Sequence, residues 1–409
     1  MQHHHLSKRA EAYLQRLCLE IPHRRLGSEG NRAATAFFAE TVASFGFSTE
    51  CAEFDCLDWS HGEARLVAGG KSYEALISPY SLGCDVSAPL VVASAVDELE
   101  RVAAGDKVLL MRGDLAKEQL MPKNFPFYNP EQHQKILNLL EAKNPAAIVA
   151  ATSRNPELAG GMYPFPLIED GDFDIPSVYT TDDEGKRLAE HAGREVSLAI
   201  EAERLPAKGY NVIARRAPDS GQRVVLCAHI DAKEGTPGAL DNATGVAILL
   251  LLAELLQDYD GEMGIEIVPM NGEDHYSAAG QILYLRENAD TLRRVVLAIN
   301  MDAAGYHEGD TAYSLYGCPD EIASSIREAF SKQDGMVEGE QWYQGDHSIF
   351  VQNQVPALAI TSEQLLKLMT QVTHTMGDRP EIVDYNKLAA AALALRRLLL
   401  NLTGRHEAR

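Results

Sequence analysis

Histidine, aspartate and glutamate recur at particular points of the C-terminal half of the 409-residue sequence, where apolar stretches end. Each of three apolar stretches is followed by such residues, and two more lie at a helix start and in a late loop. The candidates in chain order are His229, Asp231, Asp241, Glu273, Asp274, Asp302 and His374. Imidazole and carboxylate groups are the ligands of zinc and related divalent cations. Together these residues indicate a metal centre.

The number and charge of these groups suit two metal ions. Two imidazoles and three carboxylates oppose four positive charges with three negative ones, and one shared hydroxide brings the cluster near neutrality. One bridging carboxylate would hold both ions. Asp231 can then accept a hydrogen bond from the imidazole of His229, and Glu273 can take a proton from a water molecule at the metals.

Each candidate also has a simpler interpretation when taken alone. A single His-x-Asp is more often a hydrogen-bonded turn than a metal site, and Asp241 is explained as a helix cap. Glu273 and Asp274 suit a solvated loop, and Asp302 and His374 suit turn or loop positions. Only the joint pattern favours the metal centre.

The surrounding elements would bring these residues to one place. Strands are expected at 223–230, 264–271, 295–302 and 355–361, and helices at 243–259, 279–294, 320–333 and 384–402, the last capped by Asp384. This alternation predicts a mostly parallel sheet with helices on both faces. In such sheets, ligands bind outside the carboxyl ends of the strands.

The N-terminal half is organised differently. Residues 6–21 and 28–46 read as helices, with Ser28 as N-cap and Gly46 as the stop, and a strand follows at 47–59. From His61 to Val196 short β-like runs alternate with Gly and Pro. We therefore expect an α/β catalytic domain made of residues 1–60 and 197–409, with a β-rich insert domain at 61–196.

The motifs HID (229–231), GALDN (238–242), GED (272–274), NMD (300–302) and THT (373–375) follow one another over about 150 residues. In this order they resemble those of the di-zinc exopeptidases that include aminopeptidase Y, glutamate carboxypeptidase and glutaminyl cyclase. The resemblance implies that His229 and Asp302 bind one zinc, that Asp274 and His374 bind the other, and that Asp241 bridges them. Glu273 would be the general base, and the Asp241–Asn242 peptide bond would be cis.

Two further regions are interpreted from the same resemblance. The segment WYQGDHSIF (342–350) is similar to one that supplies a group over the oxyanion, which makes Tyr343 and His347 candidates, with Asp346 as a support. The insert resembles a protease-associated domain in texture and position. The sequence departs from many relatives in having Asp274 where they have glutamate, and in the position of the glycine within HYSAAGQ (275–281).

Composition narrows the classes of partner. A net charge of −22 disfavours nucleic acid and anionic membrane surfaces as partners. The longest apolar run, 246–256, is shorter than the roughly 20 residues of a membrane span, and the N-terminus has no secretory core. Six cysteines without C-x-x-C spacing indicate reduced thiols. We expect a cytoplasmic protein, and a homo-oligomer is left open.

The expected function is that of a metallopeptidase that removes N-terminal residues from peptides with a free N-terminus, using two Zn²⁺ or other divalent ions. A carboxypeptidase or a glutaminyl cyclase on the same metal framework is the first alternative. A carboxypeptidase would need an arginine cluster, and only Arg379 lies near the motifs. A catalytically inactive binding relative is the second alternative.

Overall fold

The computed structural model describes residues 2–21, 23–125, 129–155, 161–216, 221–275 and 278–402. The chain divides into two compact units, the first made of Met1–Cys56 and Lys208–Arg409 and the second of Leu57–Ala207. The borders expected from the sequence, at 60/61 and 196/197, fall close to these but do not coincide with them. The strands β1 (Ser48–Ala68) and β8 (Glu195–Arg216) continue through the two divisions as unbroken strands, so neither division falls at a turn.

The first unit is built on a mixed, mostly parallel sheet with the strand order β13-β12-β14-β11-β9-β10-β8. The pairs β9/β10, β9/β11, β11/β14 and β12/β13 are parallel, whereas β8/β10 and β12/β14 are antiparallel. The remaining bounds are β9 Arg223–His229, β10 Gly264–Met270, β11 Val295–Met301, β12 Thr311–Tyr316, β13 Met336–Glu338 and β14 Ala357–Ser362. The strand β12 was not identified from the sequence, because its polar residues hide the apolar pattern.

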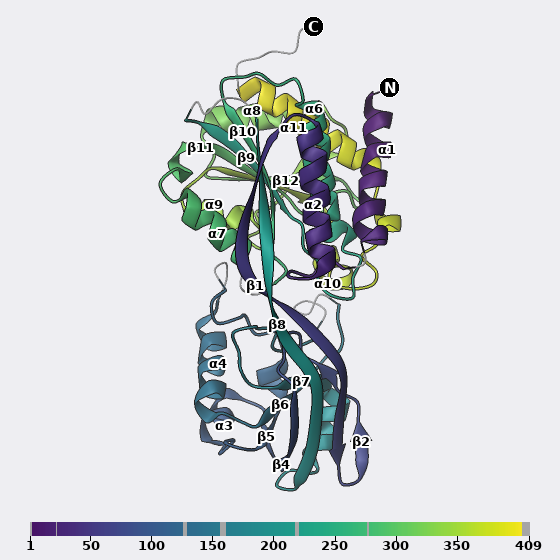
Figure 1. Cartoon of the computed structure of the whole chain (residues 1–409), viewed down its shortest axis with the longest axis vertical. Helices are drawn as coiled ribbons and strands as arrows, with labels where there is room; N and C mark the ends of the chain where they lie inside the picture. The colour runs from purple at the N-terminus through teal and green to yellow at the C-terminus, as the bar shows by residue number, and fades with distance from the viewer. Residues whose placement is uncertain are drawn as a thin grey trace. The chain divides into compact units, whose positions relative to one another are not determined.

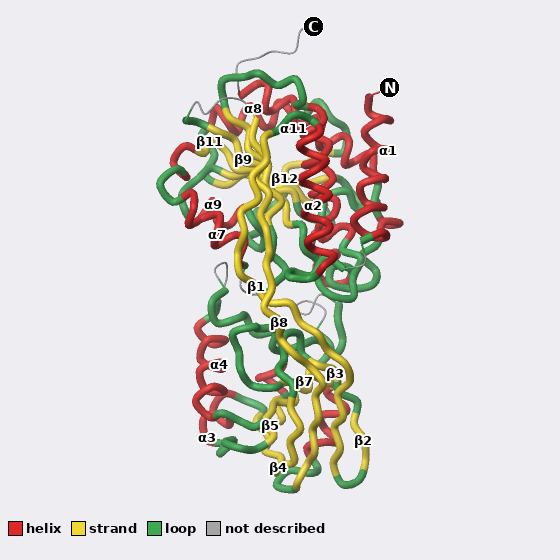
Figure 2. Tube along the Cα trace, viewed as in Figure 1, coloured by secondary structure: helices red, strands yellow, loops and turns green. Residues whose placement is uncertain are grey.

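Helices cover this sheet on both faces, as expected (Figure 1). The helical segments of the unit are α1 Gln2–Gln15, η1 Arg16–Glu20, α2 Glu29–Ser44, η3 Ala239–Ala243, α6 Thr244–Leu255, α7 Ala279–Asn288, η4 Leu292–Arg294, α8 Asp320–Phe330, α9 His347–Gln352, α10 Leu365–Gln371, η5 Pro380–Ile382 and α11 Tyr385–Leu402. In Figures 1 and 2, α1 and α2 lie on one side of the strands, and α7 and α9 lie on the other. The mostly parallel sheet with helices on both faces agrees with the sequence prediction.

The helix α6 lies at the centre of the main core. Its residues from Thr244 to Ala253 are all buried, and it packs against α1, α11 and β9. A helix that is apolar on every side is stable only when neighbours surround it, which explains its run of leucines. The core therefore holds the helix that Asp241 precedes.

Two predicted helix ends have the expected local chemistry. The side chain of Ser28 accepts a hydrogen bond from the backbone N–H of Asn31 at 3.1 Å, and Gly46 has a φ of +83° after α2. At the start of α11, Asp384 accepts a hydrogen bond from the N–H of Asn386 at 2.9 Å.

In the second unit, the strands follow one another in the order β8-β4-β5-β6-β7-β3. Its elements are β2 Lys71–Tyr73, β3 Leu76–Ile77, β4 Cys84–Ala93, α3 Val96–Arg101, β5 Val108–Met111, η2 Gly113–Ala116, α4 Glu131–Lys143, β6 Ala147–Thr152, β7 Ser177–Thr181 and α5 Asp182–Ala189. The strands β4 to β7 pair in parallel. The unit is rich in strands, and it also carries the helices α3, α4 and α5, which the sequence reading did not separate from loops.

None of the described helices combines the length and the hydrophobicity that crossing a bilayer requires.

Candidate metal centre

The candidate residues lie where three neighbouring parallel strands end. His229 is the last residue of β9, Glu273 and Asp274 follow β10, and Asp302 follows β11 directly. Because β9 pairs in parallel with both β10 and β11, their carboxyl ends meet at one edge of the sheet. The topology brings together residues that are distant in the sequence.

Asp241 lies between the two histidines. Its Oδ1 atom is 3.0 Å from Nε2 of His229, and its Oδ2 atom is 3.0 Å from Nε2 of His374. One carboxylate therefore faces two imidazoles with separate oxygens. This is the arrangement of a ligand shared by two metal ions.

Each histidine has a further carboxylate beside it. Asp302 Oδ1 lies 3.8 Å from His229 Nε2, and Asp274 Oδ1 lies 3.1 Å from His374 Nε2. His229, Asp241 and Asp274 each offer a ligand atom within 4.8 Å of the others. The structure thus pairs the five residues as the resemblance implies, with Asp241 common to both groups.

Glu273 lies beside this cluster rather than within it. Its Oε2 atom is 4.0 Å from Nε2 of His229. Burial raises the pKa of the Glu273 carboxyl well above its usual value; His229 opposes this effect, and the negative charges of Asp274 and Asp302 add to it. A carboxyl group held next to the cluster in this way suits proton transfer.

Asp231 contacts His229 differently from the expectation. The Nδ1–H of His229 donates to the backbone carbonyl of Asp231 at 3.1 Å, whereas Oδ1 of the carboxylate is 3.8 Å away. The prediction that this side chain orients the imidazole is corrected: the backbone carbonyl does so. Since a carbonyl only accepts, the proton lies on Nδ1 and Nε2 is left to face the metal cluster.

The carboxylate of Asp231 instead holds the turn that carries Glu273. It accepts backbone N–H bonds from Gly272 at 2.7 Å, Glu273 at 3.2 Å and Asp274 at 3.1 Å. The His275 ring adds a contact between Nδ1 and Oδ2 at 2.8 Å. These four hydrogen-bond donors to one buried carboxylate fix the backbone position of Glu273 and Asp274.

The charges of the cluster do not balance among the protein groups alone. The carboxyl groups of Asp241, Glu273, Asp274 and Asp302 face two imidazoles. Burial by itself would lower the pKa of His374, but Asp274 and Asp241 outweigh it and raise this pKa to about 10. Burial raises the pKa of Asp302 to about 6. Surplus negative charge in a buried space favours the binding of cations.

An unpartnered atom supports the same conclusion. Nε2 of His229 is buried and has no hydrogen-bond partner among the described residues, although carboxylate oxygens lie 3.0–4.0 Å from it. A metal ligand directed at a cation has this pattern. The nitrogen and oxygen donors present are those that zinc accepts.

The backbone around Asp241 is specialised. The Asp241–Asn242 peptide bond is cis, as the resemblance implies. The amide of Asn242 donates to the carbonyl of Met301 at 2.8 Å, and its Oδ1 atom accepts from the N–H of Gly245 at 3.0 Å. A Cβ atom on Gly245 would lie 2.4 Å from both of these oxygens, so the start of α6 approaches the end of β11 as closely as only glycine permits.

The candidates for the oxyanion group have different outcomes. His347 is wholly buried, with its Nε2 atom 2.8 Å from the carbonyl of Trp342 and Nδ1 3.3 Å from the amide of Asn300. Both ring nitrogens bond within the protein, which does not favour the expectation that His347 faces the oxyanion, and this role stays a prediction. Asp346 is bound to Gln281 at 2.8 Å rather than to either candidate. Tyr343 is 56% exposed, and its role stays a prediction.

Several residues near the centre were missed from the sequence. Asp378 and Arg24 bind the backbone that leads into Asp241, and Asn31 binds Asn271, which precedes the turn of Glu273. Lys233 lies close enough to Asp274, Glu273 and Asp241 for their charges to raise the pKa of its amine, but burial outweighs them and lowers it to about 8. The motifs gave no signal for Arg24, Asn31 or Lys233. Only Asp378, which follows His374 by four residues, lies where the sequence could have indicated a role.

Comparisons with known proteins agree with this geometry. Residues 211–399 match the model of peptidase family M28. A probable lipoprotein aminopeptidase of Mycobacterium tuberculosis is 25% identical over 311 residues, which cover 71% of this chain and 58% of that protein. The chain thus spans less than two thirds of the length of that relative. Leucine aminopeptidase 2 of Trichophyton equinum is 25% identical over 89% of this chain and 73% of its own length.

The fold is shared with solved structures. A zinc aminopeptidase from Bacillus subtilis superposes with a TM-score of 0.73 at 20% identity, covering 98% of this chain and 96% of that chain. A glutaminyl cyclase from Fimbriiglobus ruber gives a TM-score of 0.52 at 12% identity over 96% and 94% of the two chains. These similarities support the α/β architecture with a central sheet.

Proposed function

Residues 211–399 match the model of peptidase family M28, and on this premise we propose that the protein is a metal-dependent aminopeptidase, which hydrolyses the N-terminal peptide bond of peptides. One observation carries the proposal: the two oxygens of Asp241 each lie 3.0 Å from a different histidine. Each histidine has its own second carboxylate, so the ligands form two groups with one member in common. We propose that two zinc ions bind there, His229 and Asp302 holding one and His374 and Asp274 the other.

The chemistry follows from the placement of the residues. Zinc bound there would polarise the scissile carbonyl and lower the pKa of water. Glu273 takes a proton from the attacking water molecule and delivers it to the nitrogen of the amine that leaves. Asp231 keeps Glu273 in place through its contacts with the backbone of residues 272–274. The proton taken in the first step is thus returned in the second.

The proposed substrates are peptides with a free N-terminus. We propose that the free α-amine lies beside the scissile bond, where the second metal ion or a nearby carboxylate would hold it. The fungal relatives are named leucine aminopeptidases. We therefore propose that the substrates of this protein have an apolar N-terminal residue. An N-acetyl group removes the free amine and should abolish the reaction.

The alternatives from the sequence receive less support. Arg379, the residue considered for binding a C-terminal carboxylate, is exposed and lies 3.8 Å from Glu381. The curated relatives described above are named aminopeptidases, which does not favour a glutaminyl cyclase. An inactive relative is disfavoured because all five ligand candidates and Glu273 are brought together.

The test uses a leucyl peptide with a free amine and its N-acetylated form, each with and without a chelator, together with the zinc content of the purified protein. We expect cleavage of the free peptide only, its loss with chelator, and two zinc ions per chain. Cleavage that survives metal removal, or equal cleavage of both peptides, would rule out this function. Release of the C-terminal residue would favour a carboxypeptidase.

We further propose that the second unit is a protease-associated domain, that the protein is cytoplasmic and that it can form a homo-oligomer. Expression of the chain followed by fractionation and sedimentation would address the last two.

A further inference from the structure

Two buried charged residues outside the ligand set hold the turn that leads into Asp241. We propose that Arg24 and Asp378 are positioning residues that fix the carboxylate of Asp241 between His229 and His374, and so set the affinity for both metal ions at once. The inference rests on the proposed metal-dependent function. It concerns how this chain builds the site and adds no ligand.

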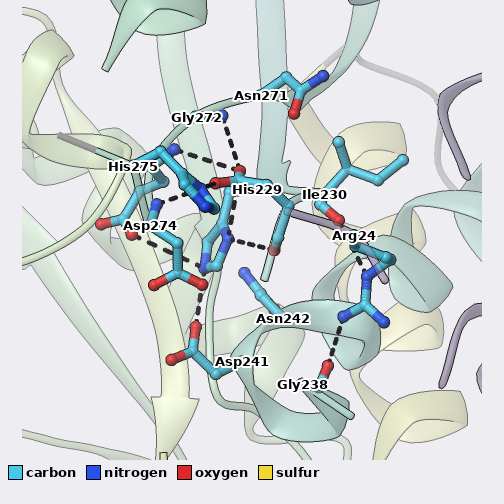
Figure 3. A network of polar contacts seen from close by, with 12 residues as sticks. Arg24, His229, Ile230, Gly238, Asp241, Asn242, Asn271, Gly272, Asp274 and His275 are labelled. Atoms are coloured by element: carbon cyan, nitrogen blue, oxygen red, sulfur yellow. Dashed lines mark hydrogen bonds and ion pairs between the residues drawn. The ribbon is translucent and has the colours of Figure 1, made fainter. Parts of the chain in front are cut away.

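Arg24 holds the turn from the side of its carbonyl groups. It is 4% exposed, and its guanidinium donates to the backbone carbonyls of Ile230 at 3.0 Å, Pro237 at 3.0 Å and Gly238 at 2.7 Å. A fourth bond reaches the carbonyl of Leu17 at 2.8 Å. Figure 3 shows the guanidinium directed at Gly238 and Ile230. One side chain therefore ties both ends of the loop that joins β9 to α6.

Gly238 shows how closely the turn fits. Its φ is +59°, and an added Cβ atom would lie 2.8 Å from Nη2 of Arg24, 2.7 Å from the carbonyl oxygen of Asp241 and 2.6 Å from Cβ of Ala232. The guanidinium is seated directly against the backbone. A shift of either partner changes the path of residues 238–241.

Asp378 holds the same turn from the side of its amide groups. The wholly buried carboxylate accepts the N–H of Leu240 at 2.7 Å with Oδ1 and the N–H of Asp241 at 3.0 Å with Oδ2. The backbone carbonyl of Asp378 accepts the N–H of Ala239 at 3.3 Å. Asp378 also follows His374 by four residues, so it connects the turn of Asp241 to the loop that carries His374.

The charges match what they contact. A cation faces carbonyl oxygens at 237 and 238, and an anion faces N–H groups at 240 and 241. Hydrogen bonds to charged groups are stronger than neutral ones, and removing a partner leaves buried groups unsatisfied. The turn is thereby fixed at both ends. Replacing a residue that orients a metal ligand typically lowers metal affinity by about 10–100-fold, and we expect an effect of this size here.

The test measures the zinc affinity of the purified full chain by competition with a chelator. The temperature is kept well below the thermal unfolding midpoint of each variant. Arg24→Met and Asp378→Asn should each weaken both zinc ions together, by about 10–100-fold. His374→Ala should weaken mainly one ion, because it belongs to one group only. Simultaneous weakening of both ions separates positioning of a shared ligand from the loss of a single ligand.

A matched control comes from the other end of β9. Arg223 is also largely buried, and it donates to Asn288 at 3.0 Å and lies 3.5 Å from Glu266. Arg223→Met should lower the unfolding midpoint and leave zinc affinity unchanged. If Arg24 contributed only to stability, Arg24→Met would likewise lower the unfolding midpoint and leave zinc affinity unchanged.

The outcomes are distinguishable. If the unaltered protein binds no zinc, the proposed function fails and this inference fails with it. If the unaltered protein binds zinc and both variants keep an affinity within about twofold, the inference alone is overturned. If Arg24→Met does not fold, Arg24→Lys and the nearly isosteric Asp378→Asn decide, since Asp378→Asn replaces one acceptor oxygen by a donor and leaves the guanidinium in place.

Discussion

At the scale of single residues, the division of labour among the carboxylates is the main result. Asp241 faces both histidines, Asp231 binds backbone amides, and Glu273 touches neither set of ligands closely. Neighbouring carboxylates of the same chemical type thus differ in role because their partners differ. Two substitutions test this division.

Glu273→Gln should reduce kcat by roughly two to four orders of magnitude, because glutamine cannot take up a proton. Both metal ions should remain bound, since Glu273 is not a ligand in our assignment. Steady-state kinetics and zinc content check this, with the exposed Glu287→Gln on α7 as control. A variant that keeps near-normal kcat would remove Glu273 from the mechanism.

Asp231→Asn should disturb the turn 272–275. The asparagine side chain has an NH2 group in place of one carboxylate oxygen. This NH2 group would face backbone N–H groups that now donate to Asp231, so those hydrogen bonds would be lost. We expect a loss of about 1–3 kcal/mol in the free energy of unfolding together with a lower kcat. Urea unfolding and kinetics measure both, and the exposed Asp290→Asn serves as control. Unchanged stability and activity would contradict the role of the carboxylate.

At the scale of elements, α2 is connected to the end of β10 by a pair of amides. Asn31 Nδ2 donates to Asn271 Oδ1 at 2.8 Å, and Asn271 Nδ2 donates to Asn31 Oδ1 at 3.0 Å. Asn31 also donates to the carbonyl of Arg24 at 3.0 Å. The N-terminal segment therefore supports the turns of both Asp241 and Glu273, although it carries none of the motifs.

Asn31→Leu should lower the free energy of unfolding by about 2 kcal/mol, because it removes the donor to the buried side-chain oxygen of Asn271 and one of the two bonds to the carbonyl of Arg24. Urea unfolding measures the change. Thr41→Val on the same helix removes only a bond to the carbonyl of Phe37 and should stay within about 0.5 kcal/mol. Equal effects of the two substitutions would show that the amide pair has no special weight.

At the scale of the whole molecule, the stability of the first unit should depend on the neutral state of His347. Burial lowers the pKa of this histidine to about 4, against 6.5 for an exposed histidine. A depressed pKa stabilises the fold fully above pH 6.5, and this contribution is lost as the pH falls from 6.5 to 4. It amounts to at most about 3 kcal/mol.

Urea unfolding of metal-free protein between pH 4 and pH 7 checks this prediction. His347→Gln can keep the donor to Trp342 and the acceptor for Asn300 but does not titrate. Its stability should fall less steeply with decreasing pH than that of the unaltered protein, and the other ionisable groups are common to both. Parallel pH profiles would mean that His347 is not buried in its neutral form.

The sequence by itself was sufficient to predict the alternating strands and helices and to single out the candidate metal-binding residues. Apolar strands followed by His, Asp or Glu leave a pattern that is local, so 229, 273, 274 and 302 could be assigned to one edge of a sheet. The same local pattern explains why Ser28 and Asp384 were recognised at helix starts. Periodicity and motif order carry this information without any knowledge of contacts.

Only the tertiary structure decided which group contacts which. Arg24 and Asp378 meet the turn at 237–241 although 354 positions separate them in the sequence numbering. The carboxylate of Asp231 binds residues 272–275, and His347 is buried with both nitrogens engaged. Such contacts join segments through packing in three dimensions. Hydrogen-bond partners of this kind leave no periodic or local trace in the chain, so residue type alone could not reveal them.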